Sequence, residues 1–175
     1  IYWKGGQGMR IPAWATRVVQ DDQTKIFSAQ IWDVEPYKWK NPLPKIEQAP
    51  LIYEAHVGMA TEEYKVGTFS EFTKNILPQI KESGYNTVQL MAIQEHPYYG
   101  SFGYHVSSFF APSSRFGTPE ELKELIDTAH GMGLRVVMDL IHSHAVKNTE
   151  EGLGKYDGTD FQFFHKGEKG THGAW

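Results

Sequence analysis

Three short apolar runs mark the second part of the chain, at positions 51–57, 87–93 and 134–141. Continuous apolar runs of this length are typical of strands buried on both faces, as in parallel sheets, whereas a strand with one wet face alternates apolar and polar residues. The third run carries Asp139 toward its end, and two histidines follow within five residues. The pattern therefore predicts three parallel strands, with chemistry at the C-terminal end of the third.

Two helices are predicted between these strands. Apolar residues recur at helical spacing from Phe69 to Ile80, and Pro78 late in that segment predicts a bend or a local loosening. The sequence 118–121, Thr-Pro-Glu-Glu, combines a capping box with proline at the first helical position, so a second helix should begin there. Gly131 and Gly133 predict its end. Strands that alternate with helices indicate an α/β fold with a parallel sheet.

The first 50 residues follow a different pattern. Positions 10–19 and 27–32 read as short β pieces separated by polar turns. An extended segment follows, which cannot be helix interior because proline recurs along it, at Pro36, Pro42, Pro44 and Pro50. We therefore predict two parts: residues 1–50, the end of a small β domain plus a linker, and residues 51–175, the α/β part.

Three parallel strands are a piece of either an open doubly wound sheet or a (β/α)8 barrel. No glycine-rich phosphate loop of the GxGxxG or GxxxxGK[ST] kind follows any predicted strand, which argues against a nucleotide-binding domain. A complete barrel needs about 250 residues, so the chain would hold its first third. The start at Ile1 and the end at Trp175 also read as cut ends.

The connection from position 94 to position 117 is long for a loop between a strand and a helix, which usually has roughly 2 to 6 residues. It is also rich in aromatic residues. A long aromatic segment at the C-terminal end of a strand predicts a binding loop. Its tyrosines Tyr98, Tyr99 and Tyr104 are the candidates for contact with a sugar ring.

Composition excludes several classes of function. Charged residues make up 22% of the chain and the net charge is −4, which gives no electrostatic reason to expect a nucleic acid or an anionic membrane as partner. No apolar run approaches the ~20 residues of a membrane span. The absence of cysteine excludes thiolate catalysis and disulfides. Aromatic residues are abundant, at 14%, which suits either core packing or a sugar site.

Several segments match one family of enzymes, in the family's order along the chain. They are 53–59 (Tyr-Glu-Ala-His-Val-Gly-Met), 86–93 (Asn-Thr-Val-Gln-Leu-Met-Ala-Ile), 95–106 (Glu-His-Pro-Tyr-Tyr-Gly-Ser-Phe-Gly-Tyr-His-Val), 139–144 (Asp-Leu-Ile-His-Ser-His), 157–160 (Asp-Gly-Thr-Asp), 164–165 (Phe-His) and 170–172 (Gly-Thr-His). With these segments the chain resembles the glycogen and starch branching enzymes of eukaryotic type, which belong to the α-amylase superfamily, glycoside hydrolase family 13.

The resemblance implies a fold and an activity. The fold would be the first three strands of a (β/α)8 TIM barrel, preceded by the end of a β-sandwich carbohydrate-binding domain. The parent enzyme would cleave an α-1,4 glucan with retention and transfer the chain to a 6-hydroxyl, making α-1,6 branches. Its partners would be α-glucans (glycogen, amylose or amylopectin chains), with no cofactor, no nucleic acid and no membrane. Its location would be cytoplasmic, or the plastid in a plant. A debranching enzyme, an amylase and a non-catalytic glucan-binding fragment stay open as alternatives.

The resemblance also assigns roles to residues. Tyr104 would stack against the reacting glucose, Asp139 would hold the hydrogen-bond network, and His144 would donate to hydroxyls of the same sugar. The nucleophilic Asp and the general acid Glu would follow barrel strands four and five, beyond Trp175, so this chain would contain no catalytic carboxylate. Ser143 stands where many α-amylases have an Asn that binds calcium, and a hydroxyl is a poorer ligand. The resemblance therefore implies no metal.

Two other sites can be drawn from the residues themselves. Any two of Glu54, Glu95 and Asp139 could form a glycosidase carboxylate pair, although the resemblance makes the two glutamates structural. His142 and His144 could bind zinc, but no third ligand at a zinc-binding spacing is present. Neither site is favoured, and His142 is expected to be a packed or solvent-facing loop residue.

Overall fold

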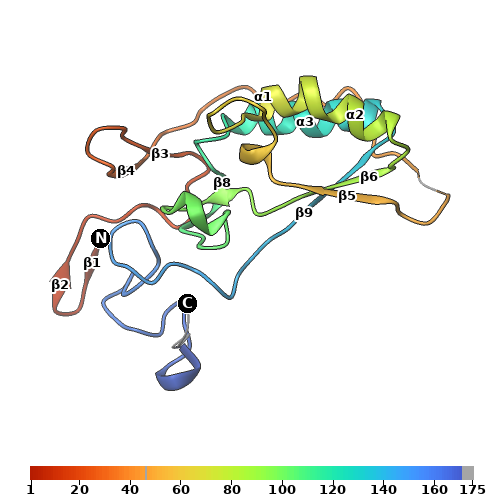
Figure 1. The fold of residues 1–175 in the computed structure, drawn as a ribbon. Helices are drawn as coiled ribbons and strands as arrows, with labels where there is room; N and C mark the ends of the chain where they lie inside the picture. Colours follow the sequence, from red (N-terminus) through yellow and green to blue (C-terminus); the bar gives the residue numbers. More distant parts are fainter. Residues whose placement is uncertain (46, 171–175) are drawn as a thin grey trace.

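The computed structural model describes residues 1–45 and 47–170. Its centre is a parallel sheet in the order β5-β6-β9, formed by β5 (Ile52–Ala55), β6 (Thr87–Leu90) and β9 (Arg135–Met138). The register aligns Glu54 with Gln89 and Gln89 with Val137. All three predicted strands are thus confirmed, and each is shorter than predicted. The sheet and its helices occupy one half of the molecule (Figure 1).

The first predicted helix is divided into three segments. These are α1 (Phe69–Glu71), a π-helical segment (Phe72–Ile76) and α2 (Leu77–Glu82). In the π-helical segment the N–H of Leu77 donates to the carbonyl of Phe72, five residues back. Pro78 has no N–H to give to the carbonyl four residues before it, and its ring crowds that carbonyl. The local loosening predicted at Pro78 is therefore present as a wider turn just before it.

The second helix, α3 (Pro119–Gly131), begins as the sequence predicts. The Thr118 side chain accepts from the Glu121 N–H, and the Glu121 carboxylate accepts from the Thr118 N–H. The helix gives way at Met132 to Gly133, whose φ of +75° suits glycine. Both predicted ends of this helix are confirmed.

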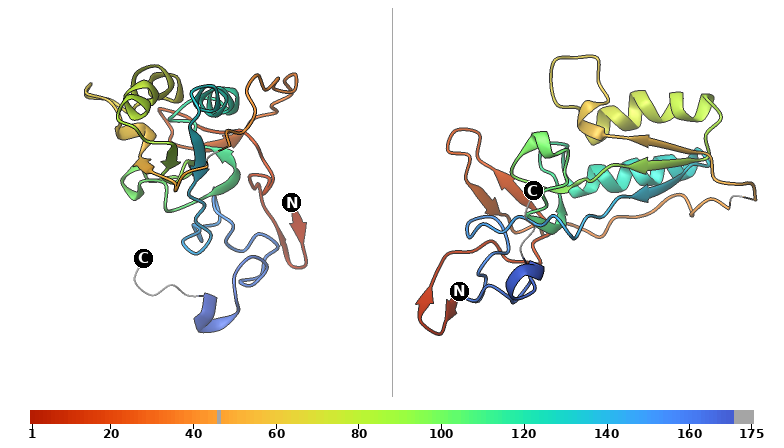
Figure 2. Two further views of the ribbon diagram at one scale, coloured as in Figure 1. Left: turned by 90° about the vertical axis from the view of Figure 1, so that its right-hand side faces the viewer. Right: turned by 60° about the horizontal axis from the view of Figure 1, so that its bottom comes forward.

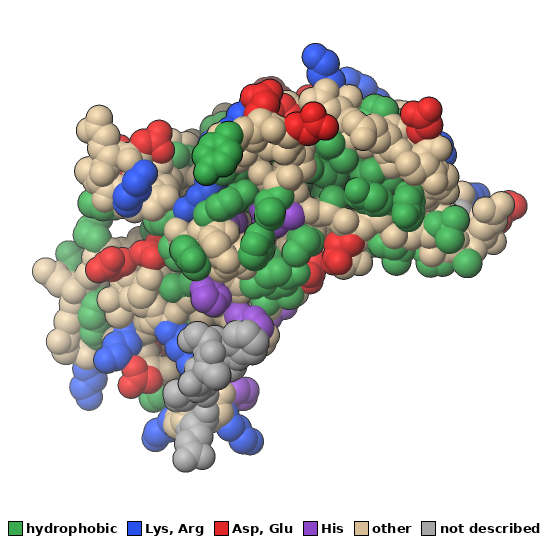
Figure 3. All heavy atoms as spheres, viewed as in Figure 1, with side chains coloured by type: hydrophobic (Ala, Val, Ile, Leu, Met, Phe, Trp, Pro, Cys, Tyr) green, Lys and Arg blue, Asp and Glu red, His purple; other side chains and the backbone are tan. Residues whose placement is uncertain are grey.

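The helices pack on one face of the sheet (Figure 2). Side chains from that face of the strands and from α1, α2 and α3 form the main core, whose buried members are Val57, Phe69, Phe72, Leu77, Ile80, Val88, Leu90, Ile93, Phe116, Leu125, Ala129 and Leu134. On the other face, Ile52 is 48% exposed and Val137 is 44% exposed. The prediction that the strands are buried on both faces is wrong for β5 and β9, because among the described residues helices cover a single face. Hydrophobic side chains are visible along the sheet in Figure 3.

The long connection after β6 contains secondary structure of its own, which sequence analysis did not predict. Strand β7 (Gln94–Glu95) pairs antiparallel with β8 (Ser108–Pro112), with a register shift between its two residues. A 3₁₀ turn (Tyr99–Ser101) lies between them. The connection is therefore a hairpin-based projection at the C-terminal end of the sheet.

Residues 1–45 form two antiparallel hairpins and an extended segment. The hairpins are β1 (Tyr2–Trp3) with β2 (Gly6–Gln7) and β3 (Val18–Gln20) with β4 (Phe27–Ala29). Val18 and Phe27 pack with Ala111 of β8, so the β3–β4 hairpin packs against the β7–β8 hairpin. Positions 10–17, predicted as β, are not a strand.

The extended segment follows α3 and is held by one buried carboxylate. Asp127 of α3 is 2% exposed and accepts hydrogen bonds from the Tyr37 hydroxyl and from the backbone N–H groups of Lys40 and Asn41. These contacts fix the segment against α3.

The remaining short helices are 3₁₀ turns at Val57–Met59, after β5, and at Gly167–Gly170. No helix among residues 1–45 and 47–170 is long and apolar enough to cross a membrane. The matching positions Thr171 and His172 lie outside the described residues.

Candidate functional site

The site is centred on a hydrogen bond between Tyr104 and Asp139. Asp139 follows β9 directly, and its N–H donates to the Leu90 carbonyl of β6, so the carboxylate lies at the C-terminal edge of the sheet. The Tyr104 hydroxyl, 35 residues away in sequence, donates to Asp139 Oδ2 at 3.0 Å. Both side chains are half-buried. The structure thus brings together two of the three residues that the resemblance singled out.

Burial raises the pKa of Tyr104 above its ordinary value of 10.0, and the hydrogen bond to Asp139 and the charges of Asp139 and Glu54 add to the effect. The phenol therefore stays protonated and continues to donate to the carboxylate. A neutral ring with its hydroxyl fixed by an anion presents an oriented, partly apolar face.

The backbone before Tyr104 is tightly constrained. Phe102 has a left-handed φ of +54° and Gly103 follows at +89°. A side chain at Gly103 would overlap the Ala92 carbonyl oxygen, so this position requires glycine. The ring of His56, at the end of β5, packs edge-on against Tyr99 and Phe102. These contacts hold the chain close to the end of the sheet where Asp139 lies.

The two predicted histidines lie in the segment that leaves β9. His142 is exposed, and its ring stacks on Phe109 with centroids 5.5 Å apart and planes 6° apart. His144 is half-buried. The N–H of Val146 donates to the Val106 carbonyl at 2.9 Å, which fixes this segment beside the one that carries Tyr104. His144 therefore belongs to the same end of the molecule as the Tyr104–Asp139 pair.

The two glutamates considered for a carboxylate pair have structural partners. Glu54 is on the uncovered face of the sheet and accepts a hydrogen bond from the Gln89 amide at 2.7 Å. Glu95 is fully buried and is occupied by Ser113, Ser114 and Arg115. A carboxylate enclosed in this way cannot reach a sugar, so neither of the two pairs that include Glu95 is supported.

No three His, Asp or Glu side chains lie close enough to hold a metal ion in the part of the chain that the structure describes. The His142 ring stacks on Phe109, and Ser143 is exposed. The arrangement offers hydrogen-bonding groups and aromatic rings, which suit a neutral polar ligand.

Sequence analysis missed two buried histidines close to the site. His56 is 7% exposed and neither ring nitrogen has a hydrogen-bond partner among the described residues, and burial lowers its pKa, with a smaller contribution from His96. His96 is fully buried, and burial lowers its pKa to about 4. Its Nδ1 must donate to the Gln94 carbonyl, at 2.9 Å, because a carbonyl can only accept. Both rings are therefore neutral parts of the core near pH 7.

A cavity of about 1150 Å3 lies elsewhere. Its walls come from residues 9–12, 14–16 and 24–31 and from Thr149, Glu150 and Glu151, and they include neither Tyr104 nor Asp139. A large cavity is the default expectation for a ligand site. Here the Tyr104–Asp139 pair has the stronger claim, because it lies at the C-terminal ends of parallel strands.

The chain matches the family described as "Alpha amylase, catalytic domain" over residues 55–172. It is 58% identical over 170 residues to a 1,4-alpha-glucan-branching enzyme of Yarrowia lipolytica, and the alignment covers 95% of this chain and 25% of that protein. It is 56% identical over 168 residues to the enzyme of the same name from Rhizophagus irregularis, with the same coverage.

A similar solved structure is that of a Salmonella typhimurium protein assigned as an alpha amylase. It shares 30% identity and a TM-score of 0.66, over 85% of this chain and 24% of that one. The chain thus spans about a quarter of the length of the curated relatives it matches.

Proposed function

The chain belongs to the alpha-amylase family, and from that premise we propose that the protein it comes from is a 1,4-alpha-glucan branching enzyme. The parallel sheet with its three strands and two helical connections is a fragment of the amylase-type TIM barrel. Relatives that carry the branching-enzyme name are 56–58% identical over 95% of the chain. The activity is proposed for the whole protein, of which this chain is about a quarter by comparison with those relatives.

One observation carries the proposal to the level of residues: the hydrogen bond from Tyr104 to Asp139 at the C-terminal end of the strands. In a barrel of parallel strands this is the end at which substrates bind. Tyr104 would offer its ring to the reacting glucose and Asp139 would hold the phenol in orientation. His144 would donate to the sugar hydroxyls, where hydrogen bonds that strengthen in the transition state accelerate the reaction.

The remaining parts of the proposal follow the family. The nucleophilic Asp and the general acid Glu would come from strands beyond Trp175 and act by a retaining double displacement. Residues 1–50 would be the end of a β-sandwich carbohydrate-binding domain and its linker, and residues 51–175 the first third of the barrel. The two hairpins in residues 1–30 are compatible with this division. The ligand would be an α-glucan and the location the cytoplasm, or the plastid in a plant.

The alternatives differ in their products. A branching enzyme passes the cleaved chain to a 6-hydroxyl, so α-1,6 linkages appear, while an amylase passes it to water. A glucan-binding protein without catalysis produces neither change. The full-length protein should therefore be incubated with amylose and followed by proton NMR of the anomeric region. We expect α-1,6 signals to grow as α-1,4 signals decline; a loss of α-1,4 signals without new α-1,6 signals would replace the proposal by hydrolysis.

A further inference from the structure

Tyr104 lies on a loop that is closed at its base. The loop runs from Glu95 to Ser107, and the Glu95 carbonyl accepts from both the N–H of Ser107, at 2.8 Å, and its hydroxyl, at 3.1 Å. Tyr104 is three residues before the closing end. The geometry of the base is therefore one of the constraints on the Tyr104 ring, besides the contacts of Phe102 and Gly103 at the tip.

The Glu95 side chain locks this base. The carboxylate is fully buried and accepts from the Ser113 hydroxyl at 3.0 Å, from the Ser114 N–H at 2.7 Å and from Arg115 Nη1 at 3.4 Å. A buried carboxylate is tolerated only where an opposite charge and hydrogen bonds replace its water. The Glu95 carboxylate thereby connects the start of the loop to the segment 113–115, which follows the end of the loop.

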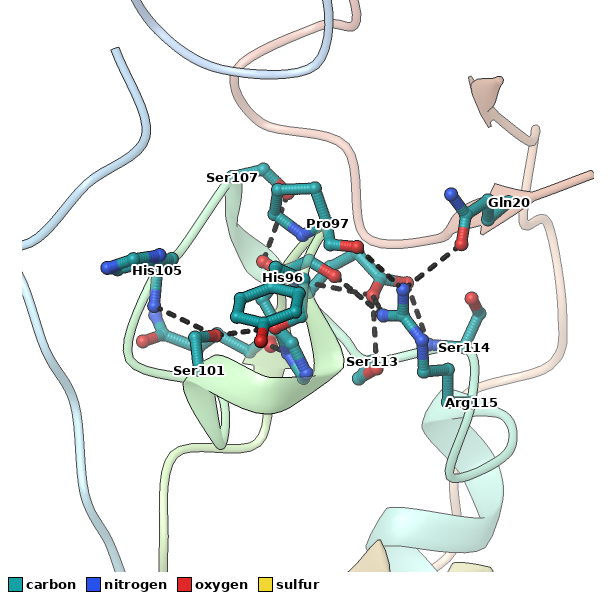
Figure 4. A network of polar contacts seen from close by, with 12 residues as sticks. Gln20, His96, Pro97, Ser101, His105, Ser107, Ser113, Ser114 and Arg115 are labelled. Carbon is teal, nitrogen blue, oxygen red and sulfur yellow. Dashed lines mark hydrogen bonds and ion pairs between the residues drawn. The ribbon is translucent and has the colours of Figure 1, made fainter. Parts of the chain in front are cut away.

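Arg115 is the second half of the lock, and Figure 4 shows its guanidinium among these groups. Besides the carboxylate it binds the first two carbonyls after Glu95: Nη1 donates to His96 O at 2.6 Å and Nη2 donates to Pro97 O at 2.9 Å. Nη2 also donates to the Gln20 side chain of β3 at 3.0 Å. A planar guanidinium can serve these acceptors at once, whereas a lysine ammonium offers a single point of charge on a flexible stem.

We propose that Arg115 and Glu95 are positioning residues for the α-glucan reaction: they hold the base of the 95–107 loop so that Tyr104 stays on Asp139 and faces the sugar. The inference rests on the proposed function for its substrate. Neither residue touches the substrate itself, since Glu95 is buried and Arg115 is turned toward backbone carbonyls.

The side chains at the tip of the loop are partly exposed, so the contacts at its base contribute to the position of Tyr104. Tyr98 is 65% exposed and Phe102 is 42% exposed, so packing at the tip is incomplete among the described residues. The carbonyls that Arg115 binds belong to the entry side of the loop. If the guanidinium is lost, these carbonyls lose their donor and the entry side can shift. A displacement of about 1 Å at a substrate-positioning group can cost roughly 100-fold in rate.

A double-mutant cycle in the full-length protein tests the inference. The variants are Arg115→Lys, Tyr104→Ala and the double variant, and the measured quantities are kcat and KM for branching of amylose. We expect Arg115→Lys to lower kcat/KM roughly tenfold when Tyr104 is present and less than about twofold in the Tyr104→Ala background. An equal loss in both backgrounds, or no loss when Tyr104 is present, would overturn the inference.

Arg135→Lys is the matched control. Arg135 is a half-buried arginine of β9 whose Nε donates to the Pro44 carbonyl at 3.0 Å, at the opposite end of the strands from Tyr104. The substitution Arg135→Lys removes a guanidinium contact to a backbone carbonyl, as Arg115→Lys does. Its effect on activity should be small and the same with and without Tyr104, even where its effect on the melting temperature matches that of Arg115→Lys.

A further readout does not require branching. In full-length protein with 13C-labelled tyrosine, the Tyr104 phenol can be identified by its absence in Tyr104→Phe and titrated by NMR. In Arg115→Lys the titration of Tyr104 should move down toward that of an ordinary tyrosine, because the phenol leaves Asp139. If the wild-type protein does not branch amylose, the proposed function fails while this titration still decides the positioning claim. An unchanged titration in Arg115→Lys would contradict it.

Discussion

At Asp139 a single carboxylate follows the third parallel strand and accepts a hydrogen bond from Tyr104. Its position after a continuous apolar run identifies it from sequence, because such runs end where parallel strands present their chemistry. Its partner Tyr104 is one of three candidate tyrosines in the aromatic loop, and the family resemblance singles it out, since a tyrosine in such a loop carries no periodic signal. The contact between them depends on the folded path of residues 95–107, which no local pattern predicts.

Asp139→Asn tests this link. The substitution keeps the shape and removes the charge, so we expect branching activity to fall by roughly 100-fold and the pKa of Tyr104 to drop toward 10. The assay is kcat on amylose together with the tyrosine titration. Glu54→Gln is the control, because Glu54 acts on Tyr104 by its charge and is hydrogen-bonded to Gln89. A loss of activity in Glu54→Gln as large as in Asp139→Asn would show that the hydrogen bond has no special role.

The buried histidines predict a pH dependence of stability. The pKa of His96 is about 4 in the folded protein against an ordinary value of 6.5, chiefly because of burial. Between these values the unfolded chain binds the additional proton. The free energy of unfolding should therefore be fully retained above pH 6.5 and should fall by about 3 kcal/mol as the pH drops to about 4.

Chemical denaturation of the full-length protein at a series of pH values measures this slope. His96→Asn should flatten it, because an amide can still donate to the Gln94 carbonyl but does not titrate. His130→Asn, in α3, is the control substitution. Equal slopes in wild type and His96→Asn would show that His96 is not the group responsible.

The burial of His56 and His96 could not be predicted from sequence, because a lone histidine beside an apolar run gives no sign of its burial.

At the level of elements, local sequence signals predicted the helix and strand order, and the structure adds what they could not encode. The helix at Pro119 has a complete capping box, and its first turn is also tied to α1 because Ser70 donates to Glu121 at 2.8 Å. The β7–β8 pair was not predicted, since one strand has two residues and the pairing is irregular. Such pairing depends on the surrounding chain more than on propensity.

Thr118→Ala should weaken the helix start. It removes the side chain that accepts from the Glu121 N–H, so we expect the free energy of unfolding to fall by about 1 kcal/mol. Thr118→Ser retains the hydroxyl and should remain close to wild type. Urea denaturation of the full-length protein measures both, and an alanine variant as stable as the serine variant would indicate that the cap contributes nothing.

At the scale of the whole molecule, the sheet has one covered and one open face. Ile52 and Val137 on the open face are about half exposed, and β5 and β9 are edge strands of the sheet among the described residues. Edge strands with exposed apolar side chains favour association with other chains. The sequence led to an expectation of full burial, because the apolar runs are those of a complete barrel in which further strands fill the interior.

Residues 1–175 produced alone should therefore lack a cooperative unfolding transition. We expect a broad melt by circular dichroism and strong binding of a hydrophobic dye before heating. The full-length protein, whose remaining strands would cover the open face, should melt sharply. A sharp two-state melt of monomeric 1–175 would contradict the view that it is a fragment of a barrel.

We propose that the full-length protein transfers α-glucan chains and does not release them to water. The most direct measurement is the number of reducing ends in amylose after incubation with the protein, counted before and after treatment with a debranching enzyme. Transfer leaves the first count unchanged and raises the second, because each new branch becomes a free chain when it is cut. A rise in the first count, with no further increase after debranching, would show hydrolysis in place of transfer.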